Sequence, residues 1–281
     1  MIKKKLTRSF RNLFVLFLCL IITFVFNVQV YGVNKLPYNP KEIIKDSNST
    51  IEGGRYSYDS AEIQDNIFKG IKTTNGEKMV FLTFDDGPSL DNTPRVLDIL
   101  KQYGVKATFF VLGTNLDNGP AYEELLKRTI QEGHAIANHG YSHNYSYLYP
   151  GRVINYTNLK EDMNKSHDIM KKILGENFKT RVMRLPGGLR SWKGQTDTLK
   201  RLNSEGFTVM DWNALNGDAE GKVINNPDVL VQNAIKSAGN SNCVVLLMHD
   251  FAGKTGRFTA EALPRIIEHF KNKGYQFRTM Y

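Results

Sequence analysis

Residues 79–89 read MVFLTFDDGPS and join an apolar run to two adjacent acids, a glycine and a proline. Five of the first six residues are apolar, so the run predicts a buried strand. Asp-Gly is a common turn dipeptide, and one interpretation of Asp85 and Asp86 is an ordinary turn. The other interpretation is a functional site, because two neighbouring carboxylates repel each other unless a cation or a proton offsets the repulsion.

The chain around this stretch alternates apolar, β-type runs with segments of helical periodicity. Such an alternation is typical of βα units with a parallel sheet. About seven units in roughly 200 residues predict an α/β fold, a small (β/α) barrel. The extended runs are residues 79–84, 105–113, 134–138, 181–186, 207–213 and 243–249.

Polar residues that can bind a metal ion or take part in catalysis follow these runs. In a parallel barrel the active site forms at the carboxyl ends of the strands, so side chains at these positions are expected to meet on one face. One carboxylate and two imidazoles are a standard ligand set for Zn²⁺ or a similar divalent ion. Each residue alone also has an ordinary structural explanation, but the common placement favours a metal site. The residues concerned are Asp85, Asp86, His139, His143, Arg184, Asp211, Trp212, His249 and Asp250.

Four short motifs occur in a fixed order along the chain. They are TFDDGPS (83–89), HGYSH (139–143), RLPGG (184–188) and LLMHD (246–250). In this order they resemble the successive motifs of the polysaccharide deacetylase family, the carbohydrate esterases of family 4 with the NodB homology domain. The resemblance covers about residues 78–281. It implies a distorted (β/α) barrel, one divalent metal ion and the removal of acetyl groups from sugars, with Zn²⁺ expected and Co²⁺ as the alternative.

The resemblance also implies a role for each matching polar residue. Asp86, His139 and His143 resemble the metal ligands of the family. Asp85 resembles the catalytic base, which a cation beside it would keep from repelling Asp86. His249 resembles the general acid that protonates the leaving amine.

Further roles follow from the same resemblance. Arg184 would pair with Asp85 and keep it ionised, although a surface ion pair is its plain structural alternative. A backbone N–H near Gly187 would bind the oxyanion. Leu247 would line the acetyl pocket and Trp212 the sugar cleft, and both also fit as core residues.

The sequence departs from the family pattern in two places. The residue after the first histidine of the second motif is Gly140 instead of Ser or Thr, and Ser142 or Asn138 would have to hold the loop in its place. The fourth family motif, a Trp with an Asp three residues on and a second Trp, is irregular in MDWNALNGDAEG (210–221). The aspartate that tunes the catalytic histidine is missing in this register, and either Asp211 or Asp218 would supply the charge.

The N-terminus predicts a targeting segment. Basic residues precede the apolar run LFVLFLCLIITFVF (13–26), and Gly32 follows it, as in a secretory signal. Counted through Val33, the run approaches the ~20 residues that span a bilayer. Residues 1–32 are therefore a cleaved signal peptide or a membrane anchor. Either one leaves the body of the protein outside the cytoplasm, because the basic residues stay inside.

The remaining organisation follows from composition. Residues 33–77 predict a spacer with one short helix near 59–70, and residues 78–281 predict the deacetylase domain. The formal charge is +9, of which the basic start carries five, so nucleic acid is not an expected partner. Cys243 is expected in the core. An exported protein without a disulfide suits a bacterium.

The leading hypothesis is a metal-dependent N-deacetylase that acts on an extracellular glycan, with N-acetylglucosamine of peptidoglycan as the expected substrate. N-acetylmuramic acid, chitin-like oligomers and poly-N-acetylglucosamine are the alternative substrates. A glycan-binding protein on a decayed deacetylase scaffold is the alternative from another class, and the irregular fourth motif is its only support. We expect a monomer that contacts a membrane only through its N-terminal segment.

Overall fold

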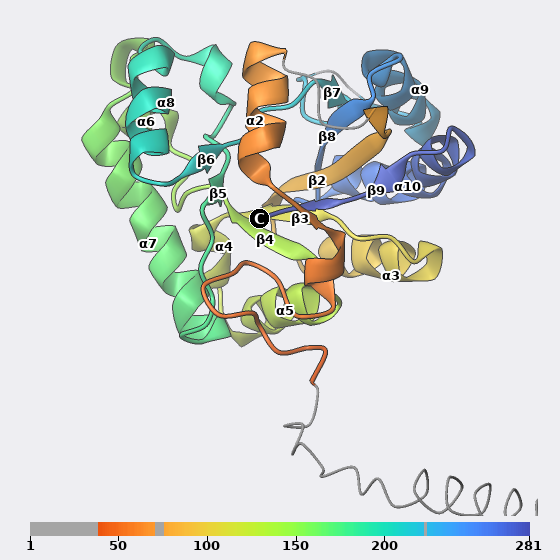
Figure 1. Ribbon diagram of the computed structural model, residues 1–281, viewed down its shortest axis with the longest axis horizontal. Coiled ribbons are helices and arrows are strands. Elements are labelled where there is room, and N and C mark those ends of the chain that lie inside the picture. Colours follow the sequence, from red (N-terminus) through yellow and green to blue (C-terminus); the bar gives the residue numbers. More distant parts are fainter. Residues whose placement is uncertain (1–38, 71–75, 222–223) are drawn as a thin grey trace, which may run out of the picture. The chain divides into compact units, whose positions relative to one another are not determined.

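Seven parallel strands form a curled, open sheet in the order β6–β5–β4–β3–β2–β8–β7 (Figure 1). The computed structural model describes residues 39–70, 76–221 and 224–281. The central strand β2 pairs with β3 on one side and β8 on the other, and Asp85 lies in register with His249. The strands are β2 (Met79–Gly87), β3 (Thr108–Val111), β4 (Ala135–Asn138), β5 (Val182–Met183), β6 (Thr208–Val209), β7 (Ala214–Leu215) and β8 (Cys243–His249). The predicted α/β fold, a distorted barrel of about seven strands, is confirmed.

Helices cover the outer face of this sheet. Val80, Leu82 and Phe84 alternate along β2 and pack in one large apolar cluster with residues of the surrounding helices. Helix α3, for example, buries Val96, Leu97 and Leu100 and ends at Gly104, which has the left-handed conformation. The helices between and after the strands are α3 (Thr93–Tyr103), α4 (Gly113–Leu116), α5 (Pro120–Gln131), α6 (Tyr145–Leu148), α7 (Tyr156–Leu174), α8 (Gln195–Ser204), α9 (Pro227–Ala238) and α10 (Lys254–Asn272).

The segment that precedes β2 covers part of the inner face of the sheet. Helix α2 (Ser60–Lys69) buries Ile63 and Ile67 against Phe81 and Val245 of the inner face, in the same apolar cluster as the predicted core residue Cys243. Strand β1 (Ser57–Tyr58) pairs with the C-terminal strand β10 (Thr279–Met280), next to β9 (Gln276–Phe277), which adds to β2.

This arrangement corrects the predicted spacer. The short helix near 59–70 is confirmed, but residues 40–70 belong to the same compact unit as the rest of the domain. The reason is the burial of α2, which the weak periodicity of residues 33–77 concealed. The predicted signal peptide or anchor, residues 1–32, lies outside the described residues. Within the described part of the chain, no helix is both long enough and apolar enough to cross a membrane.

Candidate active site and metal centre

Asp85 and Asp86 reach the same site because strand β2 changes its course between them. Strand alternation places Asp85 on the inner face with Phe81 and Thr83, and it would send Asp86 to the outer face. The pairing of β2 with β3 shifts register between Asp85 and Gly87, and Asp86 has a φ of 67°. An irregularity of this kind re-aims a side chain, so both acids lie at the carboxyl end of the strand.

Asp86, His139 and His143 form a set of three potential metal ligands. Asp86 Oδ1 lies 3.4 Å from His139 Nε2 and 3.6 Å from His143 Nε2. One ligand atom from each residue falls within 4.8 Å of the others. Asp86 Oδ1 is also buried and has no hydrogen-bond partner among the described residues. A buried carboxylate oxygen without a partner is costly, so these residues fit a divalent cation.

The electrostatics of the set are consistent with cation binding. Burial opposes the charge on Asp86, but the imidazoles of His139, His249 and His143 outweigh it and hold the pKa of that carboxyl well below its usual range. His139 Nδ1 lies 2.8 Å from the backbone oxygen of Arg184. Donation from Nδ1 to this oxygen leaves the Nε2 lone pair facing Asp86, which is the tautomer a metal ligand needs.

Asp162 of α7 holds the loop that carries the two histidines. Its carboxylate accepts hydrogen bonds from the N–H of Tyr141 at 2.7 Å and of Ser142 at 3.1 Å. Of the two predicted substitutes for the missing Ser or Thr, Asn138 accepts from the N–H of Gly140 at 2.9 Å, whereas Ser142 accepts from Asn144 further along. Asp162 was missed from the sequence, because nothing in its helical pattern shows that it faces this loop.

Arg184 and Asp85 form a fully buried ion pair. Arg184 has no exposed surface, and its Nη1 donates to Asp85 Oδ1 at 2.6 Å and to Thr83 Oγ1 at 2.9 Å. Its Nε donates to the backbone oxygen of Met210 at 2.7 Å, and its guanidinium lies 4.0 Å from the centre of the Phe110 ring. The surface ion pair, the structural alternative for Arg184, is therefore excluded. The arrangement fixes the orientation of the Asp85 carboxylate.

His249 pairs with Asp218 on the other side of Asp86. Its Nδ1 lies 2.7 Å from Asp218 Oδ1, while its Nε2 lies 4.0 Å from Asp86 Oδ2. Burial opposes protonation of His249, but Asp218 outweighs burial and raises its pKa to about 9. Thr259 and Asn216 donate to Asp218 Oδ2 at 2.6 and 3.1 Å. The pairing with Asp218 orients His249 and favours its protonated form, which suits its predicted role as proton donor.

The pair of His249 and Asp218 shows which aspartate of the irregular fourth motif contacts the histidine. The prediction left open whether Asp211 or Asp218 supplies the charge, and the structure places Asp218 on His249. Asp211 instead accepts hydrogen bonds from the N–H of Leu189 at 2.9 Å and of Arg190 at 3.2 Å, and so holds the turn after β5. The spacing in the sequence hid this, because Asp218 reaches His249 from the loop between β7 and α9.

Comparisons with known proteins agree with this geometry. The model of the polysaccharide deacetylase family matches residues 72–210. A peptidoglycan-N-acetylglucosamine deacetylase of Bacillus cereus is 34% identical over 215 residues, which is 73% of this chain and 70% of that protein. A second peptidoglycan-N-acetylglucosamine deacetylase of the same organism is 31% identical, and the match covers 73% of this chain and 88% of that protein. The chain belongs to the polysaccharide deacetylase family.

A solved structure extends the agreement to the whole fold. The structure of a Streptococcus mutans family 4 carbohydrate esterase superposes with a TM-score of 0.78 at 36% identity, covering 87% of this chain and all of that one. As a member of the polysaccharide deacetylase family, the protein is a hydrolase that acts on carbon–nitrogen bonds other than peptide bonds.

The three residues predicted to contact substrate lie around the same site, and their roles stay predictions. Gly187 follows β5 with a φ of 76°, beside Tyr145 and Trp192. Leu247 lies in β8, 5% exposed and paired with Thr83. Trp212 is half-buried, packs against the inner apolar cluster and lies 5.5 Å from the Arg184 guanidinium.

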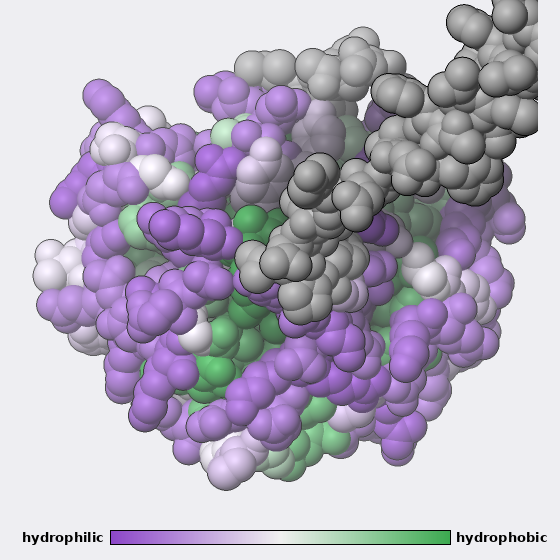
Figure 2. Space-filling view, turned by 60° about the horizontal axis from the view of Figure 1, so that its bottom comes forward, coloured by the Kyte–Doolittle hydropathy of each residue, from purple (hydrophilic) through white to green (hydrophobic). Residues whose placement is uncertain are grey.

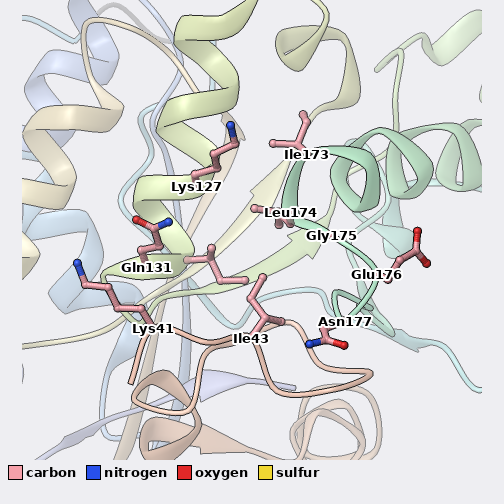
Figure 3. A pocket seen from close by; sticks show the side chains of 10 residues that line it. Lys41, Ile43, Lys127, Gln131, Ile173, Leu174, Gly175, Glu176 and Asn177 are labelled. Atoms are coloured by element: carbon pink, nitrogen blue, oxygen red, sulfur yellow. The ribbon is translucent and has the colours of Figure 1, made fainter. Parts of the chain in front are cut away.

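Two cavities lie elsewhere on this deacetylase and carry no comparable chemistry. The cavity in Figure 3, about 440 Å³, lies where α5 and α7 end, and apolar side chains such as Ile43 and Ile173 line it. A cavity of about 700 Å³ adjoins Phe207 and Tyr281.

Figure 2 also shows apolar residues exposed among hydrophilic ones on one face. Among the residues that the structure describes, only Asp86, His139 and His143 form a potential metal-binding group.

Replacement of Gly140 by Ser is expected to destabilise the histidine loop although it restores the usual family residue. Gly140 has a φ of 85°, and a Cβ there would lie 2.5 Å from Asp162 Oδ2. The left-handed conformation alone costs about 1–2 kcal/mol for other residues. Gly151→Ser is the matched control, because Gly151 has a φ of 60° with nothing within 4 Å. Thermal unfolding should show a larger loss for Gly140→Ser, and equal losses would contradict the role of Asp162.

Replacement of Asp218 by Asn is expected to shift the alkaline limb of the pH–rate profile. With the imidazolium of His249 as the predicted proton donor, kcat is high below the pKa of His249 and falls as the pH rises through it. Without the Asp218 charge, the pKa of His249 falls from about 9 toward its ordinary value, and the limb moves to lower pH. On that limb kcat should drop by about 10²-fold, the lower end of what general acid catalysis contributes.

The pH dependence of kcat for acetate release measures this shift. Asp211→Asn is the control, because Asp211 holds a turn and does not contact His249. A profile of Asp218→Asn that coincides with that of the unmodified protein would refute the pairing argument.

Proposed function

We propose that the protein removes N-acetyl groups from an extracellular glycan, with N-acetylglucosamine of peptidoglycan as the substrate. The observation that carries this proposal is the placement of two buried pairs, Asp85 with Arg184 and His249 with Asp218, beside one set of potential metal ligands. Relatives named peptidoglycan-N-acetylglucosamine deacetylases, 31–34% identical, support the substrate.

The residues divide the hydrolysis between them. A divalent ion held by Asp86, His139 and His143, proposed to be Zn²⁺, would supply Lewis acidity and lower the pKa of water. Asp85, oriented by Arg184, accepts a proton from the attacking water while a bond forms between the water oxygen and the acetyl carbonyl carbon. His249 then gives its proton to the nitrogen as the carbon–nitrogen bond breaks. Acetate and a free amine leave, and the proton on Asp85 returns to His249 through solvent.

The place of action is part of the proposal. The basic and apolar pattern of residues 1–32 supports export, with the domain either secreted or held at the cell surface. A glycan outside the cytoplasm is then the accessible substrate. A monomer is sufficient for this function, because one chain supplies the ligand set, the base and the acid.

Acetate release from purified peptidoglycan tests the proposal. The metal-loaded protein is expected to release acetate, and sugar analysis of the product should show glucosamine in place of N-acetylglucosamine. Muramic acid in the product would move the proposal to N-acetylmuramic acid. Release from chitin oligomers alone would replace peptidoglycan by a chitin-like glycan.

The glycan-binding alternative loses its only support. That support was the missing partner of the catalytic histidine, and Asp218 occupies this place at 2.7 Å from His249. A protein that binds glycan tightly and releases no acetate from any N-acetylated sugar would restore the alternative.

A further inference from the structure

An aromatic wall borders the metal-ligand set on the side of strands β4 and β5. The Tyr145 ring lies 5.1 Å from the ring of His143 and 5.0 Å from that of Trp192. Trp192 in turn stacks on Tyr149 at 4.0 Å. The proposed mechanism uses none of these three aromatic side chains.

The hydroxyl of Tyr145 is the polar end of this wall. It lies 3.2 Å from the position that a Cβ on Gly187 would take. The neighbouring hydroxyls of Tyr147 and Tyr141 are bonded to Glu161 and Asp117. The Tyr145 hydroxyl has no hydrogen-bond partner among the described residues. It therefore keeps a donor for a molecule that enters the site.

The surroundings position the backbone and the ring of Tyr145, a residue that is 44% exposed. Helix α6 begins at Tyr145, and the Asn144 side chain caps it by accepting from Tyr147 N–H. Trp192 Nε1 donates to the backbone oxygen of Pro186 at 3.0 Å and so ties the wall to the turn that contains Gly187. A donor that is positioned before the substrate arrives costs little reorganisation during the reaction.

The order of the strands places Tyr145 and His249 on opposite flanks. β4 and β5 lie on one side of β2, and β8, which ends at His249, lies on the other. In the proposed function His249 protonates the amide nitrogen, so the nitrogen of the bound acetamide faces β8. The carbonyl oxygen and the methyl group are the other two substituents of the acetyl carbon, so one of them then faces the wall that carries Tyr145, and a hydroxyl donor there suits the oxygen.

We propose that the Tyr145 hydroxyl donates a hydrogen bond to the acetyl carbonyl oxygen and strengthens it as that oxygen becomes an oxyanion. The proposal rests on the proposed N-deacetylation, because it takes the direction of the nitrogen from His249. The phenol O–H of Tyr145 is a hydrogen-bond donor. Since the charge develops only in the transition state, the bond should act on kcat and leave KM nearly unchanged.

Tyr145→Phe tests the hydroxyl and keeps the ring. Loss of one oxyanion donor typically lowers kcat by about 10²–10³-fold, and we expect about 10²-fold on N-acetylglucosamine oligomers with KM changed by less than about 2-fold. Tyr147→Phe is the matched control, because Tyr147 is exposed to a similar extent but its hydroxyl is bonded to Glu161. Metal content and unfolding temperature should be unchanged in both variants.

A binding measurement gives a second readout. An oligomer in which a methylphosphonamide replaces one acetamide mimics the tetrahedral oxyanion. Tyr145→Phe should weaken its binding by the same factor as kcat/KM and leave binding of the fully deacetylated oligomer unchanged.

The outcomes separate this inference from the proposed function. A protein that acts on chitin oligomers but not on peptidoglycan would overturn the proposed substrate and leave the Tyr145 comparison intact. If no N-acetylated sugar is hydrolysed, the analogue binding still decides the role of the hydroxyl. Full kcat in Tyr145→Phe with a raised KM in Tyr145→Ala would overturn the inference and make the wall a sugar-stacking surface.

Discussion

Asp85→Asn is expected to lower kcat for acetate release by about 10²–10⁴-fold while metal binding persists. The asparagine amide cannot accept the proton of the attacking water, and loss of a general base costs about 10²–10⁴-fold in kcat. Asp85 is not a member of the potential metal-binding group, which consists of Asp86, His139 and His143. The measurement is kcat on N-acetylated oligosaccharide together with the metal content of the purified variant.

Asp98→Asn is the control for this substitution. Asp98 carries the same charge but pairs with Arg128 on an exposed surface, so kcat should stay within about 2-fold, as surface changes are energetically small. An Asp85→Asn variant that keeps its kcat would show that another group takes the proton. Loss of the metal in this variant would instead place Asp85 among the ligands.

Arg184→Met is expected to lower the free energy of unfolding by about 3–5 kcal/mol, as removal of one partner from a buried ion pair does. The substitution leaves the Asp85 carboxylate, only 2% exposed, without its cation. It also removes the donors to Thr83 Oγ1 and to the backbone oxygen of Met210. Acetate release should be lost as well, because Asp85 is no longer oriented. Denaturant unfolding measures the free energy of unfolding.

Arg265→Met provides the comparison for an exposed pair. Arg265 and Asp228 are about half exposed, and exposed ion pairs contribute about 0–1 kcal/mol. If both substitutions cost the same, the burial of Arg184 would have no energetic consequence, and the buried ion pair would not explain a rigidly held Asp85.

The sequence predicted the catalytic and metal-binding residues of the site better than the contacts that hold these residues in place. Apolar runs that end in Asp85, His139, Arg184 and His249 place these residues at strand ends, and the parallel sheet brings strand ends together. The fold class follows from the same alternation. Both predictions depend only on local patterns and on one rule of βα topology.

The supporting contacts lie beyond such patterns, because they join distant parts of the chain. Asp162 contacts the histidine loop 20 residues away, and Asp218 contacts His249 across 31 residues. The register shift that directs the Asp86 side chain into the site cannot be predicted from the alternation of residues along the strand. Helix α2 buries Ile63 and Ile67 under the sheet, although its surroundings read as a polar spacer.

A metal titration of acetate release tests directly whether the hydrolysis depends on one divalent ion per chain. The purified chain is freed of metal with a chelator, and Zn²⁺ is added back in steps while acetate release from an N-acetylated glycan is followed. We expect the metal-free protein to be inactive, and we expect activity to rise in proportion to added metal and to stop rising at one ion per chain. Full activity of the metal-free protein, or a rise that ends only at two ions per chain, would contradict this expectation.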